Sequence, residues 1–277
     1  MNLNFGVDMT KYKKVLSIAG SDSGGGAGIQ ADIKAISACG CYAATAITAI
    51  TVQNTLGVDA VEAITAPTVA AQIRAVASDI GIDAVKIGML HSSEVILAIK
   101  SALSEYKISN IVLDPVMVST SGHKLIEADA IATLKTELIP ISRIITPNIP
   151  EAEILLNESI TTQDSMRNAA KKLGHKFNVA VLLKAGHRAD NTLIDYLYDP
   201  KCNRLIEYPS PRIDSINTHG TGCTLSSAIA AYLAQGYPLS EACKLAKEYI
   251  SKAIEYGATY QIGGGHGPVH HFWKWWK

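Results

Sequence analysis

The sequence has no excess of charge of either sign. Its 277 residues include 25 Lys and Arg and 25 Asp and Glu, so the formal net charge at pH 7 is zero. Proteins that bind nucleic acids or the surface of a membrane usually carry a basic excess. The balance disfavours both classes, and we expect neither nucleic acid nor membrane among the partners.

Long apolar runs, a secretion signal and a paired set of cysteines are also missing. The longest apolar-looking stretch, residues 43–52, contains threonines and is shorter than a membrane span. The first 14 residues include Asp8 and lack the apolar segment of a signal peptide. An odd, scattered set of five cysteines fits reduced thiols better than a disulfide framework, so we expect a cytoplasmic protein.

Short apolar runs alternate with helical patterns along the chain, in the order expected of βαβ units. The predicted parallel strands are 15–19, 43–52, 84–87, 111–113, 143–145 and 179–183. Residues 192–198 and 204–208 alternate in polarity and predict an antiparallel hairpin at a sheet edge. No linker or repeat divides residues 1–277. The pattern predicts one α/β domain, a three-layer α/β/α sandwich with a mostly parallel central sheet and a small antiparallel edge.

Ligands of such sheets bind at the carboxyl ends of the strands. Residues 20–28 follow the first predicted strand and contain five glycines. Their spacing matches neither a Walker A loop nor the dinucleotide fingerprint, which argues against a Rossmann dehydrogenase. This loop is either backbone that approaches a ligand closely, which we favour, or a flexible turn.

Polar side chains after other strands each have a plain structural alternative. Gln53 either binds a heterocyclic ligand through the paired donor and acceptor of its amide or closes a turn. Asp32, taken alone, is best explained as a solvated acid in the first turn of a helix, and Met89 as core filler. Lys184 either meets a polyphosphate or is an ordinary surface lysine.

Oxygen ligands follow two further strands of the predicted sheet. Asp114 ends one strand, and Asn148 with Glu151 follows the next. Carboxylates at adjacent strand ends suit Mg²⁺, which prefers them together with water and phosphate oxygens. The alternative for Glu151 is an acid in the first turn of a helix.

The strongest local signal is the segment 217–224, which opens a predicted helix over 221–235. Gly220 and Gly222, on either side of Thr221, allow backbone N–H groups to turn inward at a helix N-terminus and form an anion cradle. The alternative is a glycine-rich helix entry without a ligand. Cys223 lies in the first turn, where thiol pKa values tend to be lowered, so it is either a proton acceptor or a small buried thiol.

Taken together, these segments resemble the hydroxymethylpyrimidine/phosphomethylpyrimidine kinases of thiamine biosynthesis, within the ribokinase-like superfamily. The resemblance covers nearly the whole chain. It rests on residues 20–32, 53–55, 86–90, 114–117, 146–148 with Glu151, 184–187, 219–224 and the tail 265–272 with Trp275 and Trp276. One departure is small: Ala185 stands where the family often has glycine.

The resemblance implies a ribokinase-like fold, usually dimeric, and transfer of the γ-phosphoryl group of ATP. The acceptors would be 4-amino-5-hydroxymethyl-2-methylpyrimidine and then its monophosphate. Asp114 and Glu151 would hold Mg²⁺, with Asn148 beside them; Asn148 and Lys184 would face the nucleotide. Backbone amides of residues 220–223 would form the anion hole, with Cys223 as base. The residues expected around the pyrimidine are Gly20, Asp32, Gln53, Met89 and Val116.

Two alternatives remain open at this stage. One is a pyridoxal or pyridoxine kinase of the same superfamily, because both substrates are small hydroxymethyl heterocycles. The other is a non-catalytic vitamin-binding protein, which the joint presence of Asp114, Glu151, Lys184 and Cys223 disfavours. All three tryptophans lie in the last five residues, and we expect them to form a hydrophobic clasp on the domain or on a second copy.

Overall fold

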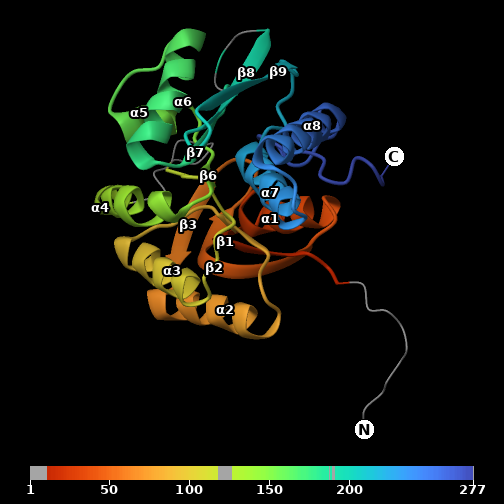
Figure 1. Cartoon of the computed structure of the whole chain (residues 1–277). Coiled ribbons are helices and arrows are strands. Elements are labelled where there is room, and N and C mark those ends of the chain that lie inside the picture. Colours follow the sequence, from red (N-terminus) through yellow and green to blue (C-terminus); the bar gives the residue numbers. More distant parts are fainter. Residues whose placement is uncertain (1–10, 118–126, 187, 189–190, 277) are drawn as a thin grey trace.

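A twisted central sheet separates two groups of helices (Figure 1). The computed structural model describes residues 11–117, 127–186, 188 and 191–276. Within them the sheet has nine strands in the order β3-β2-β1-β4-β5-β6-β7-β8-β9. The strands are β1 (Lys14–Asp22), β2 (Tyr42–Gln53), β3 (Val58–Ala63), β4 (Ala84–Ile87), β5 (Ile111–Leu113), β6 (Ile144–Ile145), β7 (Ala180–Leu183), β8 (Thr192–Asp199) and β9 (Arg204–Pro211).

Strands β2, β1, β4, β5, β6 and β7 run parallel, whereas β3 at one edge and β8 with β9 at the other are antiparallel. The chain leaves β1 in one direction for β2 and returns to β4 on its other side. This reversal makes the carboxyl ends of β1 and β4 a topological switch point, where open α/β sheets bind ligands.

The helices cover both faces of the sheet. Alternation along β1 sends Leu16 and Ile18 into one apolar core and Val15 into the other. The first core packs under α2 (Ala66–Asp79), α3 (Ser93–Glu105), α4 (Ala128–Thr133), α5 (Ile149–Leu156) and α6 (Gln163–Phe177). The second packs under α1 (Gly28–Ala38), α7 (Thr221–Ala234) and α8 (Leu239–Gly257). The predicted three-layer α/β/α sandwich with an antiparallel edge is confirmed.

The structure adds a second antiparallel edge that the sequence pattern did not predict. Strand β3 pairs with the end of β2, so residues 42–63 form a long hairpin. Five of the six residues of β3 are exposed, and Asp59 and Glu62 interrupt its apolar pattern. A strand with no buried face lacks the alternation by which strands are recognised in a sequence.

The C-terminal tail folds back from α8 across the end of the sheet. The backbone N–H of His266 donates to the carbonyl of Thr55 in the β2–β3 hairpin at 3.0 Å, and Pro268 pairs with His219 just before α7. Trp273 stacks on Tyr256 of α8 with ring centroids 5.5 Å apart. The tail therefore packs on the domain through Trp273, as expected, whereas Trp275 and Trp276 are more than half exposed and contact Phe272 of the tail itself. Within the described part of the chain, no helix combines the length and apolarity that crossing a membrane requires.

Candidate active site

A cavity of about 690 Å³ opens at the carboxyl ends of the parallel strands, a volume typical of small-molecule sites. All but one of the predicted site residues line it. They are Gly20, Gln53, Met89, Asp114, Val116, Asn148, Glu151, Lys184, Gly220, Thr221, Gly222 and Cys223. The sheet thus brings into one cavity residues that the sequence separates by up to about two hundred positions.

Asp32 is the exception, and the structure corrects its expected contact with a ligand. Its carboxylate is completely buried and accepts hydrogen bonds from Ser17 Oγ at 2.6 Å and Ser227 Oγ at 2.8 Å. Lys86 Nζ, also fully buried, lies 2.8 Å from Asp32 Oδ2. Because α1 packs between β1 and α7, this position turns into the protein interior, away from the cavity. Asp32 neutralises the buried ammonium of Lys86, a residue that lines the cavity.

The predicted anion cradle has the required backbone geometry. Helix α7 starts at Thr221, and its N-cap Gly220 has φ +78, a conformation that strains any residue with a side chain. A Cβ at Gly220 would also collide with the carbonyl oxygen of Gly26. The N–H groups of a first helical turn have no acceptor within their own helix and can bind an anion. Here Thr221 N donates to the carbonyl of Thr218 at 3.3 Å, so the N–H groups of Gly222 and Cys223 are the principal donors offered to an anion.

The N-terminus of α7 faces an ion pair between the ends of β5 and β7, the strands on either side of β6. Lys184 Nζ lies 2.8 Å from Asp114 Oδ1, and Thr146 Oγ1 donates to the same oxygen at 2.9 Å. A Cβ at Gly222 would lie 3.2 Å from Lys184 Nζ and 3.4 Å from Asp114 Oδ2. Lys184 and the cradle are therefore placed to contact the same anionic group.

Charge coupling sets the protonation of this pair. Burial alone would raise the pKa of Asp114, but Lys184 and Lys86 hold it below its ordinary value. Burial alone would likewise lower the pKa of Lys184, but Asp114 and Glu151 raise it. Both groups are consequently charged at neutral pH.

Glu151 combines a structural contact with a perturbed carboxyl group. Asn148 and Glu151 form a reciprocal capping box at the start of α5, with Asn148 N donating to Glu151 Oε2 at 2.8 Å and Glu151 N to Asn148 Oδ1 at 2.9 Å. Burial raises the pKa of Glu151 to about 7, and repulsion from Asp114 adds to the effect against the opposing charge of Lys184.

These two carboxylates fit a magnesium ion. Asp114 and Glu151 face one cavity and repel each other, so a bound cation would relieve their repulsion. Among the described residues no group of three or more His, Cys, Asp or Glu side chains forms a complete cage. Two carboxylates of this kind would leave room for the waters and phosphate oxygens that Mg²⁺ takes as further ligands.

The expected activation of Cys223 by the helix terminus is wrong. Burial raises the pKa of its thiol to about 11, Asp32 and Asp114 raise it further, and only Lys86 and the backbone N–H of Gly28 act in the opposite direction. Burial disfavours the charged thiolate, so the thiol is protonated at neutral pH.

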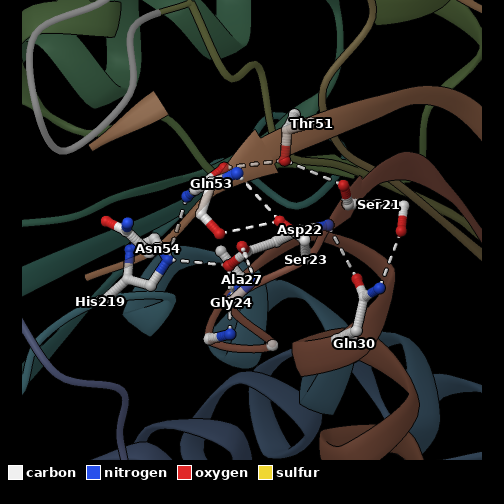
Figure 2. A network of polar contacts seen from close by, with 12 residues as sticks. Ser21, Asp22, Ser23, Gly24, Ala27, Gln30, Thr51, Gln53, Asn54 and His219 are labelled. Atoms are coloured by element: carbon white, nitrogen blue, oxygen red, sulfur yellow. Dashed lines mark hydrogen bonds and ion pairs between the residues drawn. The ribbon is translucent and has the colours of Figure 1, made fainter. Parts of the chain in front are cut away.

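The other end of the cavity is apolar on one side and polar on the other. Gly20 lies against Met89, whose Cε is 2.8 Å from the position a Cβ would take. Gln53 faces this wall from the end of β2, with its side chain within 3.2 Å of His219 Nε2 (Figure 2).

Sequence reasoning assigned no role to His219 or to its partner Asp22. Asp22 ends β1, and its carboxylate accepts backbone N–H groups of Gly24, Gly26 and Ala27 at 2.8 to 3.1 Å. His219 Nε2 lies 2.9 Å from Asp22 Oδ2 (Figure 2). The position of Asp22 at the start of a glycine-rich loop could have identified it in the sequence as a candidate site residue. Nothing in the sequence indicated that His219 would lie next to it. His187, part of the quoted resemblance, lies outside the described residues.

Comparison with known proteins agrees with this geometry. A family model described as Phosphomethylpyrimidine kinase matches residues 22–270. The hydroxymethylpyrimidine/phosphomethylpyrimidine kinase of Rhizobium meliloti is 49% identical over 263 residues, which cover 95% of this chain and 98% of that protein. The thiamine biosynthesis bifunctional protein ThiED of Geobacter sulfurreducens is 49% identical over 257 residues, 93% of this chain; the chain spans about half, 52%, of that longer protein.

A solved structure shows the same fold with ligands bound. The pyridoxal kinase of Staphylococcus aureus, in complex with AMP-PCP and pyridoxal, superposes with a TM-score of 0.85 at 30% identity, over 95% of this chain and 94% of that one. The sheet order and the cavity at its switch point are those of the ribokinase-like fold. The chain belongs to the phosphomethylpyrimidine kinase family.

Proposed function

We propose that this protein phosphorylates 4-amino-5-hydroxymethyl-2-methylpyrimidine, and then its monophosphate, with ATP, in thiamine biosynthesis. The observation that carries the proposal is the joint placement of a heterocycle pocket and an anion cradle in one cavity. Gln53 and Met89 line one part, and the N-terminus of α7 with Lys184 lines another. The names of the most similar relatives and the AMP-PCP complex of the related kinase support the choice of substrates.

In the proposed arrangement the nucleotide phosphates contact Lys184 and the backbone N–H groups of residues 220–223. Asn148 lies beside Lys184, with which it pairs across the strand ends. These donors are fixed before the reaction, so they stabilise charge on the transferring phosphoryl oxygens without reorganisation. One aimed donor of this kind contributes about 10²–10³ in rate.

Asp114 and Glu151 are the proposed holders of Mg²⁺. When bound, the ion neutralises phosphate charge and orients the transferring group. Asp114 is prepared for this by its lowered pKa, and Glu151 is fixed in place by the cap of α5.

Cys223 is the proposed proton acceptor for the hydroxymethyl group. Its side chain lines the cavity in the first turn of α7, next to the cradle. Because phosphoryl transfer passes through a loose transition state, the nucleophile gives up its proton late. The raised pKa makes the thiolate scarce at neutral pH but strongly basic where it forms.

Pyridoxal phosphorylation is the second candidate function. It is favoured by one specific observation, the close superposition on a pyridoxal kinase described as bound to pyridoxal. We further propose a homodimer, which the family resemblance supports, and a cytoplasmic location, which the odd, scattered set of free cysteines supports.

The experiment is an ADP-release assay on the purified protein. The acceptors are the pyrimidine alcohol, its monophosphate and pyridoxal, each with and without Mg²⁺. We expect Mg²⁺-dependent ADP release with both pyrimidines, at kcat/KM above that for pyridoxal. ADP release with pyridoxal alone would favour the second candidate, and ligand binding without ADP release would contradict both.

A further inference from the structure

The hydrogen bonds around Gln53 fix which way its amide points. With the Gln53 amide oxygen toward Thr51, Thr51 Oγ1 is 2.9 Å from the carbonyl oxygen of Ser21 and 3.1 Å from Gln53 Oε1 (Figure 2). Both of those oxygens accept, and a hydroxyl has one hydrogen to give. Thr51 can satisfy only one of them if the amide oxygen faces it.

The same conflict occurs at the other end of the amide. His219 Nε2 is 2.9 Å from Asp22 Oδ2 and 3.2 Å from Gln53 Nε2. Oδ2 already accepts the N–H groups of Gly26 and Ala27, which an ionised carboxylate does best. The ring nitrogen must then carry a hydrogen to donate to Asp22, and it cannot also accept one from the amide NH₂ of Gln53.

Turning the amide end for end removes the conflict at Thr51, because its NH₂ then donates to Thr51 Oγ1, which donates to Ser21. At His219 it replaces two opposed donors by one Nε2–H that Asp22 Oδ2, at 2.9 Å, and the amide carbonyl, at 3.2 Å, share. The oxygen and nitrogen of an amide are told apart by such networks rather than by shape. In the turned orientation every hydrogen bond of the network that links Asp22, His219, Gln53, Thr51 and Ser21 has a donor and an acceptor, with the His219 hydrogen shared between two acceptors.

We propose that Asp22, acting through His219, holds the Gln53 amide with its carbonyl toward His219 and its NH₂ toward Thr51, and that this orientation selects a ring with an acceptor nitrogen beside an amino group. The inference rests on the proposed function of the cavity. His219 is a positioning residue here, because it acts on the substrate through Gln53. Its ring is held by close packing on Gly26 and by its backbone pairing with the tail at Gly267 and Pro268.

The orientation also decides where the reacting group lies. In the pyrimidine alcohol the ring nitrogen N3, the 4-amino group and the 5-hydroxymethyl group follow one another along one edge. With N3 at the NH₂ of Gln53 and the amino group at its carbonyl, the hydroxymethyl group falls on the His219 side. His219 directly precedes Gly220 and the cradle, so this orientation points the hydroxyl toward the phosphoryl site. The opposite orientation would point it toward Thr51.

The test compares two substrates that differ only at this edge. The 4-oxo analogue, 5-hydroxymethyl-2-methylpyrimidin-4-one, has an N3–H donor and a carbonyl acceptor, the reverse of the amino substrate. We expect His219→Ala to release the amide and to lower the ratio of kcat/KM for the amino over the oxo substrate by about tenfold or more. His219→Gln, whose NH₂ has hydrogens for both Asp22 and Gln53, should keep the ratio within about threefold of the wild-type value.

The matched control is His266→Ala, which removes an exposed histidine of the same tail segment and should leave the ratio unchanged. A ratio that is also unchanged in His219→Ala, with both rates lowered equally, would overturn the proposal and leave a packing role. A wild-type protein with no activity on either pyrimidine would instead contradict the proposed function.

A second measurement needs no destabilising variant and no substrate turnover. The ¹⁵N shifts of labelled histidine rings in the wild-type protein report which nitrogen carries the proton, with His219 assigned by its absence in His219→Gln. We expect a protonated Nε2 at neutral pH. A bare Nε2 would overturn the proposed orientation even if His219→Ala fails to fold.

Discussion

Lys86 Nζ lies 2.8 Å from Asp32 Oδ2, and neither side chain is exposed to solvent. Asp32 comes from α1, Lys86 from β4, and Ser227 of α7 donates to the other oxygen of Asp32. Three elements around the switch point are therefore joined by one buried charge pair beneath the cavity. Such a pair fixes geometry, and breaking it leaves an uncompensated charge in the interior.

We expect Lys86→Met to lower the free energy of unfolding by about 3–5 kcal/mol, because it strands the Asp32 carboxylate. Urea unfolding followed by circular dichroism measures the loss. The control is Lys100→Met, which removes a solvent-accessible pair with Glu137 and should cost much less stability than Lys86→Met. If both variants lost the same free energy of unfolding, burial of the Lys86–Asp32 pair would make no additional contribution to stability.

Gly220→Ala should inactivate the enzyme. The left-handed backbone costs about 1–2 kcal/mol with any side chain, and the new Cβ would displace Gly26 and deform the cradle. We expect kcat to fall by about 10²–10³ in the ADP-release assay. Gly236→Ala is the matched control, since Gly236 also has positive φ, +91, but no atom lies within 4 Å of its added Cβ. If both variants kept full turnover, the cradle would not be at the N-terminus of α7.

The raised pKa of Cys223, about 11, predicts a rising pH profile. The thiolate fraction grows about tenfold per pH unit below that pKa, so kcat/KM, which reports the free enzyme, should rise with pH. Glu151, with a pKa of about 7, titrates lower, so the slope above pH 8 belongs to Cys223. Cys223→Ala should flatten this slope and lower kcat/KM by about 10²–10⁴.

The control for that profile is Cys202→Ala, which removes an exposed thiol and should leave the slope intact. A slope above pH 8 that persists in Cys223→Ala would assign the proton transfer to another group.

His271 predicts how stability depends on pH. Burial lowers its pKa to about 3, and its Nε2 lies 3.0 Å from Thr224 Oγ1 of α7. The folded protein keeps this ring neutral, whereas the unfolded chain takes up a proton below its ordinary pKa of about 6.5. Stability is therefore complete above about pH 6.5 and falls with decreasing pH, by about 2 kcal/mol at pH 5.

Urea midpoints at pH 7 and pH 5 measure this effect. His271→Gln should remove the His271 contribution to the difference between the two midpoints, and the exposed His266→Gln should not. A difference that is the same in wild type and His271→Gln would show that other groups govern the acid loss.

The sequence predicted the layers, the parallel strands and most of the cavity lining, because those features follow from local periodicity and from polar residues at strand ends. Contacts between segments far apart in the sequence could not be predicted from these local patterns. Asp32 resembles a solvated helix acid in isolation, and only the packing of α1 against α7 shows that it neutralises Lys86. For Cys223 the sequence correctly indicated the position in the first turn but not the degree of burial, which reversed the expected direction of its pKa shift.

The hairpin and the tail illustrate the same limit. β3 has no buried face, so its pairing with β2 depends on neighbours rather than on its own pattern. The close approach of Gly263 and Gly265 to Thr55 is set by the path of the tail after α8, which no local signal encodes.

The tail has one practical consequence. All three tryptophans of the chain, Trp273, Trp275 and Trp276, follow directly on the segment that pairs with His219. The intrinsic tryptophan emission of the whole protein therefore originates from a single place, a few residues from the network that orients Gln53. A rearrangement on ligand binding that moves the tail would change the emission of the unlabelled protein, with no contribution from other tryptophans.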